Sequence, residues 1–502
     1  MSGDAVCPDE LSAWALNSRE AHFHAELLSQ SVHFRVARLI EKPALDIEQT
    51  RQLLIVLRNL CSGGASVAEA ILETGVLPAV KKIATKLCCK SDSWDDECVR
   101  DENSEAGGEL RALRAGTQFL ANMSTASEAC SSAIWKEFFP VGFLQLAKVK
   151  LWHIIGPLCT CLVSCARSSK QFSSALCSRA GTPILSELLD FGRRVEGTEN
   201  ERFGENEWLL MLVGRLVYCE GLLDEMFANL HSESDPQCKM GISQLHLLQF
   251  LAIPDVLDWV PEDENSGEGM YKAFASVFQI AKNLTLMLME PGASSANATE
   301  ALEPAFMVLK NLSCLDQNTL RENGRDVVSE VCESGLVKWL LDCLRALGSI
   351  KNPRTPPEAG VVDDAKGGGD FTARMEGLDL AEGVPVATPY VGFRTDIVAI
   401  LSNVVFRRPG IQNMVLKLEG VPLLLNQCQV DDVSPLVREW AVWAIRNLCE
   451  DNLEIQNMVR GLEVQGVVKS EELDRLGIKI EVDRSTGKLR VGKKEYGAYT
   501  YI

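Results

Sequence analysis

The chain has 502 residues, and its 50 basic residues against 69 acidic ones give a formal net charge of −19. Binding to a nucleic-acid duplex needs a clustered basic surface, and because no basic cluster interrupts the acidic excess, we predict no nucleic-acid partner. Hydrophobic residues make up 46% of the sequence and aromatics only 6%. This balance is typical of helices that pack on other helices.

The first residues of the chain and its cysteines indicate a compartment. The N-terminal stretch lacks the basic and apolar regions of a secretory signal. The uncharged run that starts at Leu151 is shorter than the roughly 18 residues of a membrane span and is interrupted by Gly and Pro. The 17 cysteines are scattered through apolar positions without a disulfide spacing, which indicates reduced core thiols. We expect a cytoplasmic protein, with the nucleus left open, that does not insert into membranes.

One helical pattern recurs along residues 1–347. Apolar side chains lie six, five and two positions before an asparagine and one position after it. The pattern occurs around a series of positions, two of which carry another residue in place of the asparagine: Asn59, Asn122, Ser164, Arg215, Asn283 and Asn311. Asn122 and Ser164 are 42 residues apart, within the period of about 40–47 residues of armadillo and HEAT repeats. The sequence therefore predicts an all-α, armadillo/HEAT-like α-solenoid, a superhelix of stacked repeats.

Two segments interrupt the repeats. Residues 91–109 are predicted to form an acidic, solvated loop, because six of the residues from Asp92 to Glu102 are acidic. Residues 348–390 are rich in Gly, Pro and Asp and show no helical period. We expect this second segment to be a flexible insertion.

Residues 391–468 return to the pattern, around Asn403 and Asn447, which are 44 residues apart. Ser434 is the predicted N-cap of the last helix, with Pro435 at its first position. One face of this helix recurs at helical spacing and is predicted to be core: Val437, Trp440, Ala441, Ala444, Ile445 and Leu448.

The second face of that helix is a mixed aromatic and charged surface. An isolated amphipathic helix would seldom expose a tryptophan there, so we interpret this face as the wall of a groove that binds a protein partner. The candidate groove residues are Asn403, Glu439, Trp443, Arg446, Asn447 and Glu450. An asparagine at the reference position has two alternatives: it bonds the backbone of a bound peptide, or it bonds a carbonyl of its own superhelix.

The tail, residues 469–502, has a different pattern. Ile478, Ile480 and Val482 alternate with polar residues, and after Gly487 the alternation resumes at Leu489 and Val491. This predicts a small β-hairpin.

The run DDVSPLVREWAVWAIRNLCEDN at 431–452 resembles the signature domain of the ataxin-10 family, and the likeness extends over about residues 391–468. The preceding 390 residues resemble that family only as degenerate armadillo-type repeats. The resemblance implies a non-catalytic armadillo-like scaffold, with roles in cell division and, in animals, in neurite outgrowth and neuronal survival.

Other functions find less support. The chain has no phosphate-binding loop, nucleophile elbow or zinc-protease motif, so we predict no enzyme activity, cofactor or metal site. The alternative to a scaffold is a receptor for cargo peptides of the importin-α type, which needs a tryptophan four residues before each asparagine. Those positions hold Ile55, Gln118, Gln279, Met307, Ala399 and Trp443. Because only the last is a tryptophan, we favour a scaffold for protein partners, with homo-oligomers left open.

Overall fold

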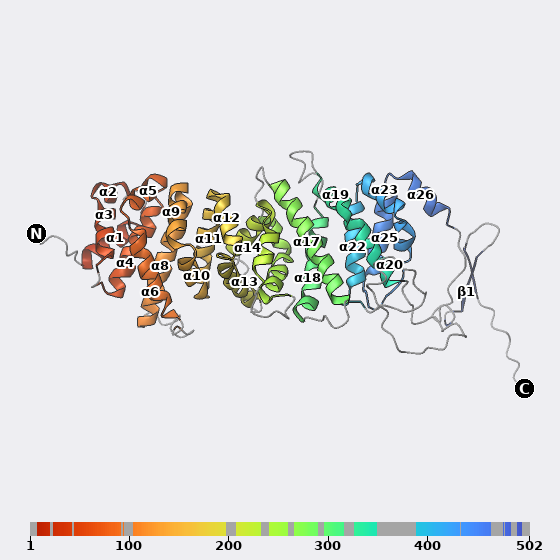
Figure 1. Cartoon of the computed structure of the whole chain (residues 1–502), viewed down its shortest axis with the longest axis horizontal. Coiled ribbons are helices and arrows are strands. Elements are labelled where there is room, and N and C mark those ends of the chain that lie inside the picture. The colour runs from red at the N-terminus through yellow and green to blue at the C-terminus, as the bar shows by residue number, and fades with distance from the viewer. Residues whose placement is uncertain are drawn as a thin grey trace, which may run out of the picture. The chain divides into compact units, whose positions relative to one another are not determined.

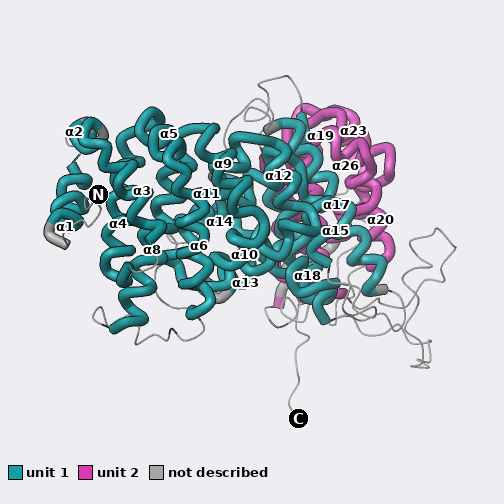
Figure 2. The backbone as a smooth tube through the Cα atoms, turned by 60° about the vertical axis from the view of Figure 1, so that its left-hand side comes forward, with its two compact units in different colours: residues 1–312, 317–327 teal, residues 313–316, 328–502 magenta. Residues whose placement is uncertain are grey.

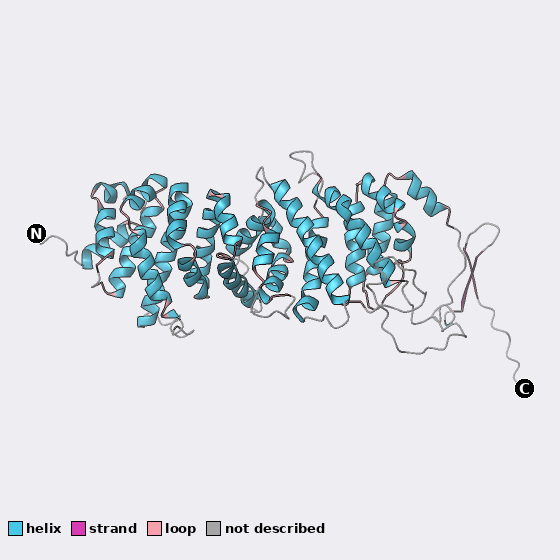
Figure 3. Cartoon of the chain, viewed as in Figure 1, coloured by secondary structure: helices cyan, strands magenta, loops and turns pink. Residues whose placement is uncertain are grey.

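A computed structural model describes most of the chain: residues 8–20, 24–42, 45–91, 94, 104–196, 207–231, 240–259, 266–289, 296–315, 326–348, 388–431, 433–462, 475, 477–482 and 489–493. These residues are mainly α-helical (Figure 3), which confirms the all-α class. They form two compact units, residues 1–312 with 317–327 and residues 313–316 with 328–502 (Figure 2). No helix in the described ranges has the length and apolar character to cross a membrane.

Unit 1 is built from groups of one long helix and two shorter ones. Its first half contains α1 (Pro8–Asn17), α2 (His24–Ser29), α3 (Val32–Ile40), α4 (Ile47–Cys61), α5 (Ala65–Glu73), α6 (Leu77–Cys88), α8 (Glu105–Ala126), α9 (Glu128–Phe138), α10 (Val141–Lys148), α11 (Trp152–Ser168), α12 (Lys170–Cys177) and α13 (Thr182–Glu196). Its second half contains α14 (Glu207–Gly214), which continues as the π-helical turn η4 (Arg215–Cys219), α15 (Leu223–Asn229), α16 (Ile242–Leu251), the 3₁₀ helix η5 (Pro254–Trp259), α17 (Ser266–Met289) and α18 (Ala296–Ser313).

Like helices of successive groups pack on one another. The helices α4, α8, α11 and α14 contact each other in that order (Figure 1), and α6, α10, α13 and α16 form a second such row. Each group therefore buries its apolar face against its neighbours, as in a solenoid.

Local signals explain where the long helices begin. Asp46 caps α4, its carboxylate accepting from the N–H of Gln49 at 2.7 Å. The Ser104 hydroxyl caps α8 by accepting from the N–H of Gly107 at 2.9 Å. The acidic loop predicted for 91–109 is therefore too long, because its last five residues form the first turn of α8. Glu109 is buried there and pairs with Lys90. The prediction that this acidic residue is solvated is therefore wrong.

Unit 2 holds α19 (Val327–Val331), which leads through the turn η7 (Cys332–Leu336) into α20 (Val337–Leu347), and then α22 (Phe393–Val405), α23 (Pro409–Lys417), α24 (Gly420–Leu425), α25 (Val437–Cys449) and α26 (Leu453–Arg460). The long helices α22 and α25 pack side by side, and α20 packs on α22, α23 and α24. These contacts group α20 with the C-terminal repeats, whereas the sequence predicts a boundary after α20, at residue 347.

The tail contains two paired strands. β1 (Ile478–Val482) and β2 (Leu489–Lys493) are antiparallel, with Ile480 opposite Val491. The connection predicted between them, at 483–488, lies outside the described residues, as does the predicted flexible insertion apart from residues 348 and 388–390.

Candidate functional site

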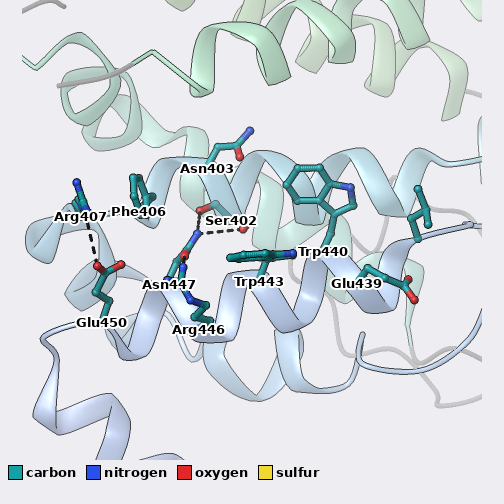
Figure 4. A pocket seen from close by; sticks show the side chains of 11 residues that line it. Ser402, Asn403, Phe406, Arg407, Glu439, Trp440, Trp443, Arg446, Asn447 and Glu450 are labelled. Carbon is teal, nitrogen blue, oxygen red and sulfur yellow. Dashed lines mark hydrogen bonds and ion pairs between the residues drawn. The ribbon is translucent and has the colours of Figure 1, made fainter. Parts of the chain in front are cut away.

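All six candidate groove residues line one pocket of about 540 Å³, formed by α22 and α25 (Figure 4). The structure adds five residues to the pocket that the sequence had not assigned to it: Ser402, Phe406, Arg407, Leu436 and Trp440. The pocket lies wholly within unit 2.

The inner face of α25 holds the helix against α22. Val437, Ala441, Ala444 and Leu448 are all at most 1% exposed. These residues recur at helical spacing, so their burial turns the opposite face of α25, with Trp443, away from the core.

The start of α25 differs from the prediction. Ser434 is not its N-cap: the helix begins at Val437, and the Ser434 carbonyl accepts from the N–H of Val437 at 3.2 Å. Leu436 has a φ of 64°, so the chain enters the helix through a turn with Pro435 in its second position and a left-handed third residue. Proline is favoured at the second position of a type II turn as well as at the first position of a helix, and in this chain Pro435 takes the turn position.

The sequence predicts that Trp440 is a core residue, and this prediction is wrong. It is half-buried and lines the pocket. The fully buried stripe runs through Val437, Ala441 and Ala444. Trp440 stands at the edge of this stripe, where a large ring extends from the helix interface into the pocket.

Two aromatic rings on the pocket wall are covered by arginines. Trp443 is 53% exposed, and the guanidinium carbon of Arg446 lies 5.0 Å from its ring centroid. Phe406 is 38% exposed, with the guanidinium carbon of Arg407 at 4.9 Å from its centroid. Such cation–π contacts orient both the rings and the charges.

The charges around the pocket are balanced. Arg407 Nε lies 3.8 Å from Glu450 Oε1. Glu439 accepts from Nη2 of Arg438 at 2.8 Å, and this hydrogen bond lowers the pKa of the Glu439 carboxyl. Two arginines, Arg407 and Arg446, and two glutamates, Glu439 and Glu450, therefore line the pocket together with its aromatic rings.

The reference asparagines bond neighbouring helices. Asn447 Nδ2 donates to the carbonyl oxygen of Ser402 at 3.0 Å, and Asn122 Nδ2 donates to that of Arg58 at 3.0 Å. In both cases the acceptor immediately precedes the reference asparagine of the neighbouring long helix. Since Asn447 is only 7% exposed, its amide nitrogen supports the stacking of α25 on α22, the second of the two alternatives.

Three other reference asparagines make comparable bonds. Asn311 Nδ2 donates to the Ala252 carbonyl at 3.2 Å. Hydroxyl groups accept from Asn59, through Ser18 Oγ at 3.0 Å, and from Asn403, through Ser313 Oγ at 3.0 Å. Asn283 differs, because its recorded bond is to Gln279 on its own helix. Among the described residues, Asn283 therefore makes no bond to a neighbouring helix.

Sequence offsets contained the signal for one missed residue. Phe406 lies three residues after Asn403, just as Glu450 lies three residues after Asn447, and both line the pocket. Leu436 gave no such signal, because nothing in its identity favours a left-handed conformation.

The fold and the pocket define an all-helical, solenoid-like repeat protein with an aromatic surface on its C-terminal repeats. Residues 393–492 match the family model described as the spinocerebellar ataxia type 10 protein domain. This match confirms the resemblance to the ataxin-10 family found in the C-terminal sequence.

Similarity to individual relatives extends beyond this domain. Ataxin-10 of Bos taurus is 24% identical over 395 residues, covering 76% of this chain and 72% of that protein. Ataxin-10 of Homo sapiens is 23% identical over 385 residues, covering 74% and 70%. The ataxin-10 homolog of Dictyostelium discoideum is 42% identical over 106 residues, covering 21% of this chain and 17% of that protein.

Proposed function

We propose that the protein is a non-enzymatic scaffold that binds a protein partner in the pocket between α22 and α25. The observation that carries the proposal is the 53% exposure of Trp443 on the wall of a 540 Å³ pocket. Tryptophan and arginine dominate the energetics of protein interfaces, and here Arg446 stacks on the Trp443 ring.

The pocket favours a partner segment with an apolar side chain and flanking charges. The apolar group would contact Trp443 and Phe406, while Arg446 and Glu450 would pair with charges on either side of it. A cytoplasmic scaffold in cell division or cell survival fits the family resemblance. An importin-α-like receptor is the less favoured alternative, because Ile55 and Ala399, which hold the tryptophan positions of two other repeats, are buried.

The test is quantitative capture of partners from a cell extract by the full chain and two variants. Trp443→Ala removes the pocket wall, and we expect it to abolish capture of the specific partner. A hot-spot tryptophan contributes about 2–4 kcal/mol to binding. Val442→Ala is the matched control, because Val442 is on the same helix and 56% exposed but does not line the pocket.

Captured proteins would be compared by mass spectrometry, after circular dichroism has shown that both variants are folded. If Val442→Ala loses the partner and Trp443→Ala keeps it, the binding surface is the neighbouring face of α25 and the proposed pocket is wrong.

A further inference from the structure

A second pocket, of about 550 Å³, lies in unit 1 among the helices α4, α8, α11 and α14. Its wall includes Arg58, Arg114, Trp152 and Trp208, and we call it the arginine–tryptophan pocket. It shares no residue with the pocket on α22 and α25, and it belongs to the other compact unit.

Neutral side chains hold Arg58 in place. Its Nε and Nη2 donate to Asn59 Oδ1 at 3.0 and 2.9 Å, and its Nη1 donates to Gln118 Oε1 at 2.7 Å. Arg58 is half-buried, and across the described part of the chain neither Arg58 nor Arg114 forms an ion pair with a carboxylate. A positioned, partly desolvated guanidinium with donors to spare is an anion-binding group.

Further positive charge surrounds the pocket. The pKa of Arg58 is lowered, first by burial and then by the charges of Arg19, Arg114 and Arg51. Of these, Arg51 is neutralised by Glu48, to which its Nε donates at 2.7 Å. Arg19 and Arg114 therefore leave an excess of positive charge around Arg58, although the whole chain carries a net charge of −19.

The pocket lining is also aromatic. Trp152, at the start of α11, is 37% exposed, and Trp208, near the start of α14, is 40% exposed. The wall also includes Gly156, where an added Cβ would meet no other part of the chain within 4 Å. Exposed tryptophans beside arginines are characteristic of protein interfaces rather than of general surface.

We propose that the arginine–tryptophan pocket binds an acidic segment of a partner protein. Carboxylates of that segment would face Arg58 and Arg114, and an adjacent apolar side chain would pack against Trp152 and Trp208. Charge complementarity selects this occupant, since within the described ranges neither Arg58 nor Arg114 pairs with a carboxylate of this chain. The interaction is independent of the scaffold pocket on α22 and α25.

The test is fluorescence anisotropy with the full chain and a short rhodamine-labelled peptide of glutamates around one phenylalanine. We expect Arg114→Gln to weaken binding about tenfold, the usual effect of losing one charge-assisted hydrogen bond. Trp208→Ala should weaken it by a similar factor, and added salt should weaken it further. Arg114 is exposed and has no ion-pair partner among the described residues, so its replacement leaves folding intact.

Three controls make the result specific. Arg38→Gln removes the same charge from an exposed position of α3 outside the pocket and should bind as the wild type does. Trp443→Ala should also bind normally, which separates this proposal from the scaffold pocket. The glutamine version of the peptide should not bind.

Equal affinity for the glutamate and glutamine peptides would overturn the proposal, as would equal losses in Arg114→Gln and Arg38→Gln. A phosphothreonine peptide that binds where the glutamate peptide does not would also overturn it, in favour of a phosphopeptide site.

Discussion

At the scale of single residues, the asparagines at the reference position connect helices that are far apart in sequence. Asn447 is buried and donates to the Ser402 carbonyl, while its Oδ1 accepts from Arg446 Nη1 at 3.3 Å. The same side chain thus fixes α25 on α22 and holds the guanidinium of the arginine that covers Trp443. Asn447 therefore contributes both to the stability of unit 2 and to the shape of the candidate groove.

We expect Asn447→Ala to lower the free energy of unfolding of its unit by about 1–3 kcal/mol, because it leaves the buried Ser402 carbonyl without its donor. Urea unfolding followed by circular dichroism measures the change. Asn283→Ala is the control: Asn283 is exposed and, among the described residues, bonds only within its own helix, so its loss should change stability little. Equal effects of the two substitutions would show that the bond between helices is not what matters.

At the scale of elements, the helical period was enough to bring the six groove residues together, because they share one face of α25 or the equivalent position on α22. The period was not enough to predict where α25 begins, because this depends on the left-handed conformation of Leu436. It was also not enough to predict the burial of side chains at the edge of the buried face, because this depends on how closely α22 packs on α25. Val398 and Val442 occupy the same offset, yet only Val398 is buried, and no sequence period distinguishes them.

Ser434→Ala tests the revised start of α25. A true N-cap serine contributes about 1 kcal/mol, but the buried Ser434 hydroxyl has no hydrogen-bond partner among the described residues. We therefore expect the variant to be as stable as the wild type or slightly more stable, as measured by thermal unfolding. A loss of about 1 kcal/mol would restore Ser434 as the cap.

At the scale of the whole molecule, each unit has its own packed interior. The reactivity of buried cysteines measures how well each interior excludes solvent. Cys159 in unit 1 and Cys343 in unit 2 are buried, and burial raises the pKa of both thiols. Cys88 and Cys89 form a matched pair on the surface of unit 1. Burial first, and then the neighbouring Cys89, raise the pKa of Cys88 to about 12, whereas Cys89 is exposed.

Iodoacetamide at mildly alkaline pH should therefore modify Cys89 quickly and spare Cys88, Cys159 and Cys343 until a denaturant is added. A raised pKa keeps the thiolate scarce at any pH well below it, and the thiolate is the reactive form. Peptide mapping by mass spectrometry gives the rate at each site. Modification of Cys159 as fast as Cys89 would contradict the packed interior of unit 1.

Five of the reference asparagines donate a bond outside their own helix, and these five bonds all point the same way along the chain. Asn59 donates to Ser18, Asn122 to Arg58, Asn311 to Ala252, Asn403 to Ser313 and Asn447 to Ser402. Every acceptor precedes its donor in the sequence. On the ribosome, each new long helix would therefore emerge with its donor after the acceptor had already been synthesised. The fold can grow vectorially from its N-terminal end, each helix docking as it is made, without waiting for residues still to come.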